Sequence, residues 1–206
     1  MVTAVPEFEA WLARAGRVRI RQSRPEDRAS LRAMHRGLST TSVYMRYFGA
    51  GINVERALER LLRPPDEIHE TLVAIVDDHI VAVACYECLD EVGAAEIAFL
   101  VDETHHGIGL ATLLLAELTL VARSRGLRRF VAVTLPSNTA MMRVFRDCGL
   151  RCSITHETDG IHIDVSLGDD PRPAHGWAGL ASTVLDPPLE RARHPVMRNA
   201  RVRLTS

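Results

Sequence analysis

The sequence predicts an α/β protein whose mixed central β-sheet of about seven strands is flanked by helices. Seven short apolar runs, separated by turn residues, have the length and pattern of strands. The order strand, loop, helix, strand over residues 94–136 predicts a parallel crossover. Two hairpin patterns, over 70–89 and 152–167, predict antiparallel pairs, so the sheet is mixed.

The first part of the chain is predicted to hold one strand and four helical segments. RVRIRQ at 17–22 alternates between polar and apolar residues, as a strand does. Ser23 with Glu26 three residues later, and Pro25 between them, is typical of a helix N-terminus. The helical segments are expected at 7–15, 23–37, 38–48 and 53–62.

The rest of the domain is predicted to supply six strands and two helices. Gly126 and Gly149 end the two helices, because glycine readily adopts the left-handed conformation found there. Asp77-Asp78 and Asp159-Gly160 are turns between paired strands. The strands are expected at 70–76, 80–89, 94–102, 128–136, 152–158 and 161–167, and the helices at 110–126 and 138–148.

Three segments follow from this pattern. Residues 1–16 are expected to form an N-terminal helical extension, and residues 17–168 the folded domain. Residues 169–206 are rich in proline and show no period, so we expect an irregular C-terminal tail.

Composition excludes several classes of function. Hydrophobic residues make up 47% and charged residues 25% of the 206, which is typical of globular proteins. The net charge of −1 and the absence of a basic block argue against nucleic acid as a partner. No apolar run is long enough to cross a membrane, and the N-terminus has no signal-peptide pattern, so we expect a cytoplasmic protein. Every basic residue is Arg, and the chain contains no Lys.

The cysteines do not predict a metal site. Cys85 and Cys88 form a CxxC pair, but an offset of three residues on a strand points the two side chains to opposite faces. No second pair completes a zinc site, so no metal is expected.

The segment VDETHHGIGLAT at 101–112 lies between a buried strand and a long helix. Glycines let backbone N–H groups approach a ligand, and a helix N-terminus favours negative charge, so a phosphate would bind well there. An ordinary tight turn gives the same pattern.

Glu96 interrupts the apolar strand AAEIAFLV. An outward-facing or Arg-paired carboxylate would explain it structurally. A carboxylate whose pKa is raised by apolar surroundings could instead remove a proton from an attacking amine.

The segment 106–111 resembles the motif Q/R-x-x-G-x-G/A, with His106, Gly109 and Ala111 at its three specified positions. This motif belongs to the GNAT superfamily of N-acetyltransferases, although His106 replaces the usual Gln or Arg. The resemblance covers about residues 17–168. It implies the GNAT fold, with acetyl-CoA as co-substrate. The implied cofactor-binding residues are Phe99, Leu100 and Val101 for the pantetheine arm, and His106, Gly107, Ile108, Gly109, Leu110, Ala111 and Thr112 for the pyrophosphate.

A second motif of this superfamily resembles Asn138, Phe145 and Gly149-Leu150. Both Asn138 and Phe145 are implied to contact the cofactor, Asn138 through its side-chain amide. Many members carry a Tyr at the aromatic position, where its hydroxyl protonates the departing thiolate. Phe145 has no hydroxyl, so that proton must come from water or another group.

Within this superfamily the chain most resembles bacterial protein lysine acetyltransferases of the Pat type. The resemblance rests on SRPED, LSTTSVYMRYF at 38–48, AEIAFLV at 95–101 and RVFRDCGL at 143–150. It implies Glu96 as general base and a lysine of a protein, such as an acyl-CoA synthetase, as acceptor. Tyr44, Arg46 and Tyr47 lie where the superfamily shapes its acceptor site.

Two other functions are compatible with these residues. One is acetylation of a small amine, such as a polyamine or an aminoglycoside. The other is a non-catalytic acyl-CoA sensor, which the absence of the Tyr would fit.

Overall fold

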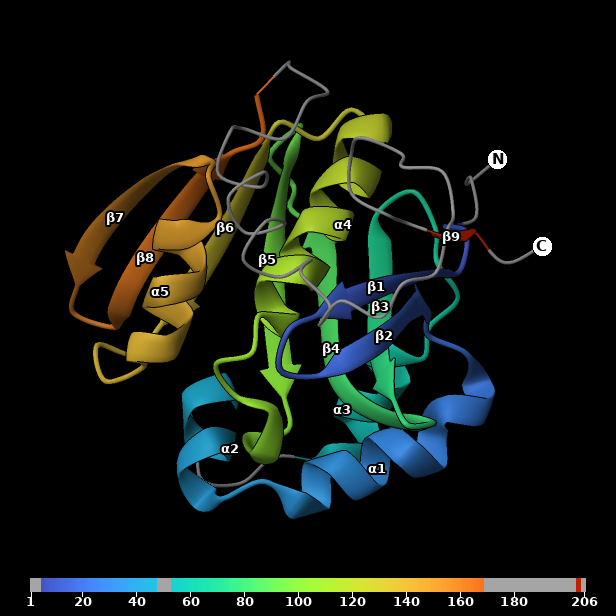
Figure 1. Cartoon of the computed structure of the whole chain (residues 1–206). Coiled ribbons are helices and arrows are strands. Elements are labelled where there is room, and N and C mark those ends of the chain that lie inside the picture. The colour runs from blue at the N-terminus through green and yellow to red at the C-terminus, as the bar shows by residue number, and fades with distance from the viewer. Residues whose placement is uncertain (1–4, 48–52, 169–202, 205–206) are drawn as a thin grey trace.

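The computed structural model describes residues 5–47, 53–168 and a two-residue strand at 203–204. Its strands form one sheet in the order β7-β8-β6-β5-β4-β3-β2-β1-β9 (Figure 1). The strands are β1 (Phe8–Leu12), β2 (Gly16–Gln22), β3 (His69–Val76), β4 (His79–Cys88), β5 (Ala94–Val101), β6 (Arg129–Thr134), β7 (Arg151–Glu157), β8 (Gly160–Ser166) and β9 (Arg203–Leu204). Among the described strands, only β5 and β6 are paired in parallel, so the prediction of a mixed α/β sheet is confirmed.

Helices cover both faces of the sheet. The helices are α1 (Arg28–Gly37), α2 (Thr40–Tyr47), α3 (Val54–Leu61), α4 (Leu110–Ser124) and α5 (Thr139–Asp147). Figure 1 shows α1, α2 and α3 together at one side, and α4 and α5 on the other. No helix among the described residues is both long and apolar enough to cross a membrane.

Two cores result, because side chains alternate between the faces of each strand. On β3, Leu72 and Ala74 pack into the core beneath α4 and α5, whereas Val73 and Ile75 pack into the core with α1 and α3. Every residue of β3 is buried, which explains the continuous apolar run LVAIV at 72–76.

The prediction of a helix at 7–15 is wrong. Phe8–Leu12 is a strand that pairs antiparallel with β2, from Phe8 with Ile20 to Leu12 with Gly16. Phe8 and Leu12 are four residues apart, a spacing that shares one face in a strand as well as in a helix. Pairing with β2, which the turn ending at Gly16 permits, decides between the two. This segment therefore extends the sheet.

The seven predicted strands are all present, and β1 and β9 add to them. The strand β9 pairs with β1 and belongs to the segment that we expected to be irregular. Residues 169–202 and 205–206 lie outside the described residues.

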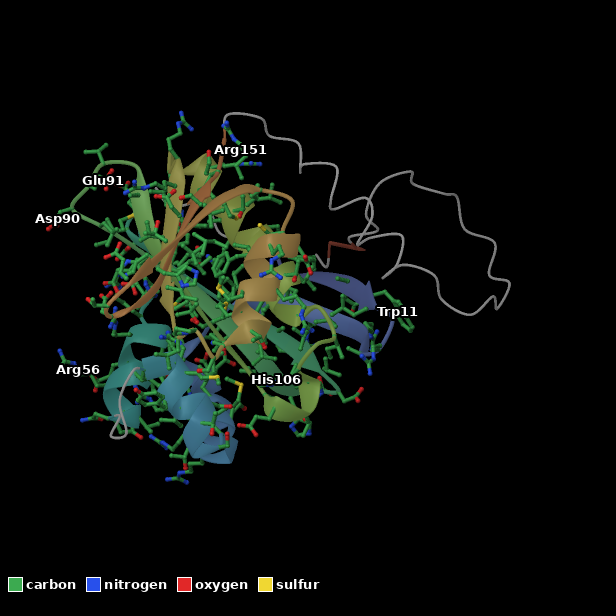
Figure 2. The ribbon with its side chains drawn as sticks, turned by 90° about the vertical axis from the view of Figure 1, so that its left-hand side faces the viewer. Trp11, Arg56, Asp90, Glu91, His106 and Arg151 are labelled. Carbon is green, nitrogen blue, oxygen red and sulfur yellow. The ribbon has the colours of Figure 1, made fainter. Side chains whose placement is uncertain are left out.

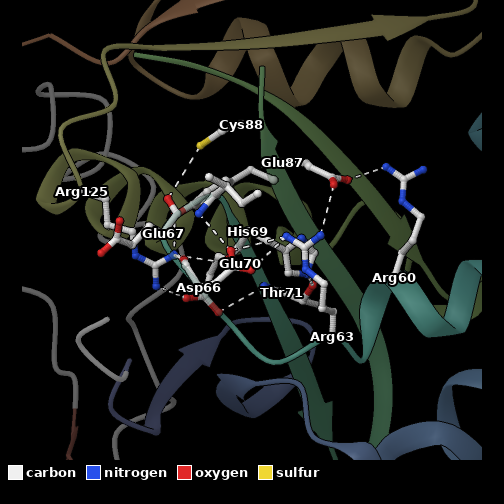
Figure 3. A network of polar contacts seen from close by, with 12 residues as sticks. Arg60, Arg63, Asp66, Glu67, His69, Glu70, Thr71, Glu87, Cys88 and Arg125 are labelled. Carbon is white, nitrogen blue, oxygen red and sulfur yellow. Dashed lines mark hydrogen bonds and ion pairs between the residues drawn. The ribbon is translucent and has the colours of Figure 1, made fainter. Parts of the chain in front are cut away.

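A buried polar network ties the end of α4 to β3 (Figure 3). The guanidinium of Arg125 forms an ion pair with Glu70, whose side chain is fully buried. It also donates to the hydroxyl of Tyr86 at 2.7 Å and to the carbonyls of Asp66 and His69. Gln22 donates to both carboxylate oxygens of Glu70, at 3.0 and 3.1 Å.

Candidate functional site

The two parallel strands separate partway along their length. The ladder between β5 and β6 pairs Ala94 with Arg129, and it ends where Glu96 pairs with Val131. Beyond that point β5 runs on to Val101 and β6 to Thr134 without further pairing between them. The edge of β5 that carries Phe99, Leu100 and Val101 therefore has no strand partner on the β6 side. Such an edge can pair with an extended ligand.

Helix α4 follows this open edge after the loop at 102–109. Gly109 is its N-terminal cap, with φ +97°, and no side chain caps the helix. The first helical hydrogen bond runs from the Leu113 N–H to the Gly109 carbonyl, at 2.9 Å. The preceding amides, those of Leu110, Ala111 and Thr112, are thus free to face an anion.

Gly107 also adopts a left-handed conformation, with φ +71°. A Cβ placed there would meet nothing within 4 Å, so the space above the loop is open. Gly107 is exposed, whereas Ile108 and Gly109 are half-buried, so the turn reaches solvent at Gly107.

The side chain of His106 stabilises the loop itself. Its Nε2 lies 3.0 Å from the carbonyl oxygen of Val101. Because a carbonyl only accepts, Nε2 must carry the proton. In Figure 2, His106 lies at the end of the molecule opposite Glu91 and Arg151. This contact gives the imidazole a structural role where the superfamily has Gln or Arg.

On the cofactor role that the motif implies for this loop, replacing Gly109 by Ala is expected to weaken coenzyme A binding by roughly tenfold, since a left-handed Ala costs about 1–2 kcal/mol of strain. The nearest atom to the new Cβ would be Leu12 Cδ2 at 3.8 Å, so backbone conformation and not a clash is the cause. Isothermal calorimetry with coenzyme A would measure the change. Gly37→Ala is the matched control, because Gly37 has no positive φ and open space around it. Equal affinities for the two variants would contradict this role of the loop.

Glu103 connects the loop to α2. Its carboxylate accepts from the Ser39 N–H at 2.8 Å and from the Ser42 hydroxyl at 2.5 Å. These hydrogen bonds lower the pKa of Glu103 to about 2. The sequence gives no sign of this contact, because a cap supplied by a distant segment leaves no local pattern.

Glu103→Gln is expected to increase amide hydrogen exchange in α2 at neutral pH, because the charged acceptor at its N-terminus is lost. The pKa of Glu103 is lower in the folded protein than the ordinary 4.5. The anchor is therefore complete above about pH 4.5 and is lost as the pH falls toward about 2. Hydrogen exchange measured by mass spectrometry would test this, with Glu59→Gln as an exposed control. Unchanged exchange in α2 would rule out the anchor.

Helix α5 starts at the same edge of the sheet, because it follows β6. Asn138 is its cap, and the Asn138 Oδ1 accepts from the Met141 N–H at 3.1 Å. This bond leaves the amide nitrogen of Asn138 available as a donor. Phe145 is fully buried and meets Phe99 edge to face, with ring centroids 6.0 Å apart. Its ring thus supports the β5 strand from beneath.

Glu96 is exposed, so it is the outward-facing carboxylate that the sequence allowed, and the alternative of apolar surroundings is wrong. The strand is apolar because its other face packs into the core, while Glu96 points to the opposite face. No ion pair to Glu96 is recorded among the described residues.

Carboxylates follow one another across this face of the sheet. Register places Glu87, Glu96, Val131, Asp164 and Ser153 in one row from β4 to β7. Directly paired residues point to the same face, so these five side chains share one surface.

Glu87 is neutralised by arginines of α3 and the segment after it. Arg60 lies 2.6 Å and Arg63 3.3 Å from its carboxylate (Figure 3). The hydrogen bond to Glu87 raises the pKa of Arg60, and the charge of Glu96 adds to this. Glu96 is therefore near Arg60 without being bound to it, a relation that the sequence did not reveal.

A shallow hollow of about 250 Å³ lies on the same face beyond Glu96. It is lined mainly by Val131, Val133, Ser153, Thr155, His162 and Asp164. These residues come from β6, β7 and β8. Along each of these strands, the side chains alternate between this surface and the opposite face of the sheet.

The residues of α2 have divided roles. The Tyr47 hydroxyl and His35 Nε2 are hydrogen bonded at 2.7 Å, which joins α2 to α1. Arg46 stacks on the Tyr47 ring at 4.9 Å, whereas Tyr44 is 49% exposed. Tyr44 is thus the accessible aromatic of this helix.

Comparison with known proteins places this geometry among acyltransferases. Residues 39–150 match the family described as Acetyltransferase (GNAT) family. The GNAT domain of S. lividans PAT superposes with a TM-score of 0.69 and 28% identity, covering 78% of this chain and 96% of that one.

Two structures from Mycobacterium smegmatis share the fold at 21% identity. RimJ in complex with CoA-disulfide has a TM-score of 0.61, covering 84% of this chain and 94% of that one. A cAMP-binding acyltransferase has a TM-score of 0.55, and the match spans 79% of this chain but only 48% of that one.

Proposed function

This chain belongs to the acetyltransferase (GNAT) family of N-acetyltransferases, and on that premise we propose that it acetylates lysine side chains of proteins, with Glu96 as general base. The observation that carries the proposal is the separation of β5 from β6 immediately after Glu96. It leaves an open backbone edge next to an unpaired carboxylate, with two helix N-termini at the same end of the sheet.

In this proposal the cofactor lies along the open edge. The backbone of Phe99, Leu100 and Val101 pairs with the pantetheine arm of acetyl-CoA, as an added strand would. The amides of the loop and the first turn of α4 receive the pyrophosphate. The free amide nitrogen of Asn138 donates to the cofactor from the start of α5. No metal takes part.

Transfer is direct. The lysine amine loses a proton to Glu96, immediately or through water, and attacks the thioester carbonyl. A backbone N–H of β5 donates to the carbonyl oxygen as it gains charge. The departing thiolate takes its proton from water, because Phe145 offers no hydroxyl. An exposed Glu96 is suited to this, since an amine or a water molecule can reach its carboxylate from solvent.

The open surface favours an extended acceptor. Glu96 and Asp164 flank Val131 and are two strands apart, about 10 Å. The hollow beyond Glu96 is shallow and mostly lined by uncharged side chains. A polypeptide segment can lie across it with one lysine at Glu96. The likeness to the S. lividans PAT domain supports the same choice.

A thiol-release assay tests the acceptor. Purified protein and acetyl-CoA are mixed with an acyl-CoA synthetase, with a polyamine, or with neither. Thiol release that requires the synthetase, with acetyl-lysine on it, is expected. Because this chain has no Lys, all acetyl-lysine in the assay belongs to the acceptor.

Two other results would replace the proposal. Release with a polyamine alone would make the protein a small-amine acetyltransferase. Tight binding of acetyl-CoA without transfer to any acceptor would make it an acyl-CoA sensor.

A further inference from the structure

Two thiols meet between the end of α5 and the start of β7. Cys148 directly follows α5 and is buried, whereas Cys152 lies on β7 and is half-buried. Their sulfur atoms are 3.7 Å apart. Both thiols lie within hydrogen-bonding distance of the Phe145 carbonyl oxygen, at 3.1 Å for Cys148 and 3.2 Å for Cys152.

We propose that Cys148 and Cys152 form a reversible dithiol–disulfide pair that controls the packing of α5 against β5. A disulfide needs its sulfurs about 2.05 Å apart, so these two must approach by roughly 1.6 Å. The turn between the cysteines holds Gly149, with φ +71°, and joins the end of α5 to the start of β7. The two sulfurs therefore face each other across a short connection.

The pair is coupled to the cofactor edge through one residue. In the reduced protein, both S–H groups donate hydrogen bonds to the carbonyl oxygen of Phe145 in the last turn of α5. Oxidation removes both donors, and the new bond draws the start of β7 toward the helix end. The ring of Phe145 packs on Phe99 of β5. A shift of this turn is therefore transmitted to the strand edge.

The chemistry is exchange with a small-molecule disulfide, RSSR. The more exposed Cys152 attacks one sulfur of RSSR as its thiolate, forms a mixed disulfide and releases one RS⁻. Its hydrogen bond with Cys148 raises the pKa of Cys152, so this first attack limits the rate at neutral pH. The thiolate of Cys148 then attacks the Cys152 sulfur and releases the second RS⁻. The protein loses two hydrogens as protons and two electrons, and RSSR is reduced to two RSH.

Cys148 is the more acidic of the two thiols in the reduced protein. The hydrogen bond with Cys152 lowers the pKa of Cys148 to about 7. Because the first attack needs the thiolate of Cys152, formation of the disulfide is expected to speed up as the pH rises. By contrast, burial raises the pKa of Cys85 and of Cys88, and these two pack into different cores. They serve as internal controls.

The experiment titrates the full-length protein with oxidised glutathione and counts free thiols by alkylation and mass spectrometry. We expect Cys148 and Cys152 to be linked within one chain, reversibly by dithiothreitol, while Cys85 and Cys88 stay reduced. Cys148→Ser should stop at a mixed disulfide on Cys152. The Cys85→Ser, Cys88→Ser double variant should oxidise like the parent protein.

A second readout tests the coupling without depending on catalysis. Hydrogen exchange in β5 and α5 should differ between oxidised and reduced protein, and affinity for coenzyme A should fall at least about fivefold on oxidation. Both effects should be absent in Cys148→Ser. Failure of the intramolecular link to form, or its formation with unchanged exchange in β5 and α5, would overturn the proposal.

Discussion

Glu96→Gln is expected to lower kcat/KM for acetyl transfer by about 10²- to 10⁴-fold at neutral pH, the usual contribution of a general base. The amide cannot accept a proton, so the variant must wait for an amine that is already neutral. The neutral fraction of a lysine amine rises about tenfold per pH unit below its pKa. The deficit should therefore shrink as the pH rises, and a pH–rate profile of both proteins would measure it.

Two variants make the Glu96 experiment specific. Glu59→Gln removes an exposed carboxylate far along α3 and should leave the rate unchanged. Glu87→Gln alters the neighbour of Glu96 in the carboxylate row, but that side chain is bound by Arg60 and Arg63. It should retain far more activity than Glu96→Gln. A Glu96→Gln protein with parental activity at neutral pH would disprove the assignment.

Arg125→Met is expected to lower the free energy of unfolding by about 3–5 kcal/mol, the cost of leaving one member of a buried ion pair alone. The side chain of Glu70 is fully buried, and that of Arg125 is 11% exposed. Without Arg125, the Glu70 charge keeps only Gln22 and the Thr71 N–H as donors. The Tyr86 hydroxyl would lose its recorded partner as well. Urea unfolding measured by circular dichroism would give the change.

The double variant Glu70→Gln, Arg125→Met isolates the charge effect. It should be more stable than Arg125→Met alone, because no ion is then left without its partner. Arg32→Met breaks a surface pair with Glu55 and should leave the urea midpoint nearly unchanged. If Arg125→Met unfolded at the same urea concentration as Arg32→Met, the buried network would contribute no more to the free energy of unfolding than the surface pair does.

The sequence by itself determined the strands, the helices and the parallel crossover of the central domain. These depend on local signals: alternation of apolar residues, glycines that end helices, and turn dipeptides such as Asp77-Asp78. The glycine loop at 107–109 was also predictable, because left-handed backbone positions favour glycine whatever surrounds them.

Only the tertiary structure decided which way the first segment folds and what surrounds Glu96. Phe8–Leu12 became a strand because β2 offers it hydrogen bonds, and its spacing of apolar residues could not reveal that partner. Alternation along a strand shows only which residues share a face. The packing of the helices decides which face is covered, and it leaves Glu96 exposed. The contacts of Glu103 with α2 and of Cys148 with Cys152 likewise depend on where separate elements meet. Contacts between elements arise from the packing of the whole chain, and a local pattern cannot specify them.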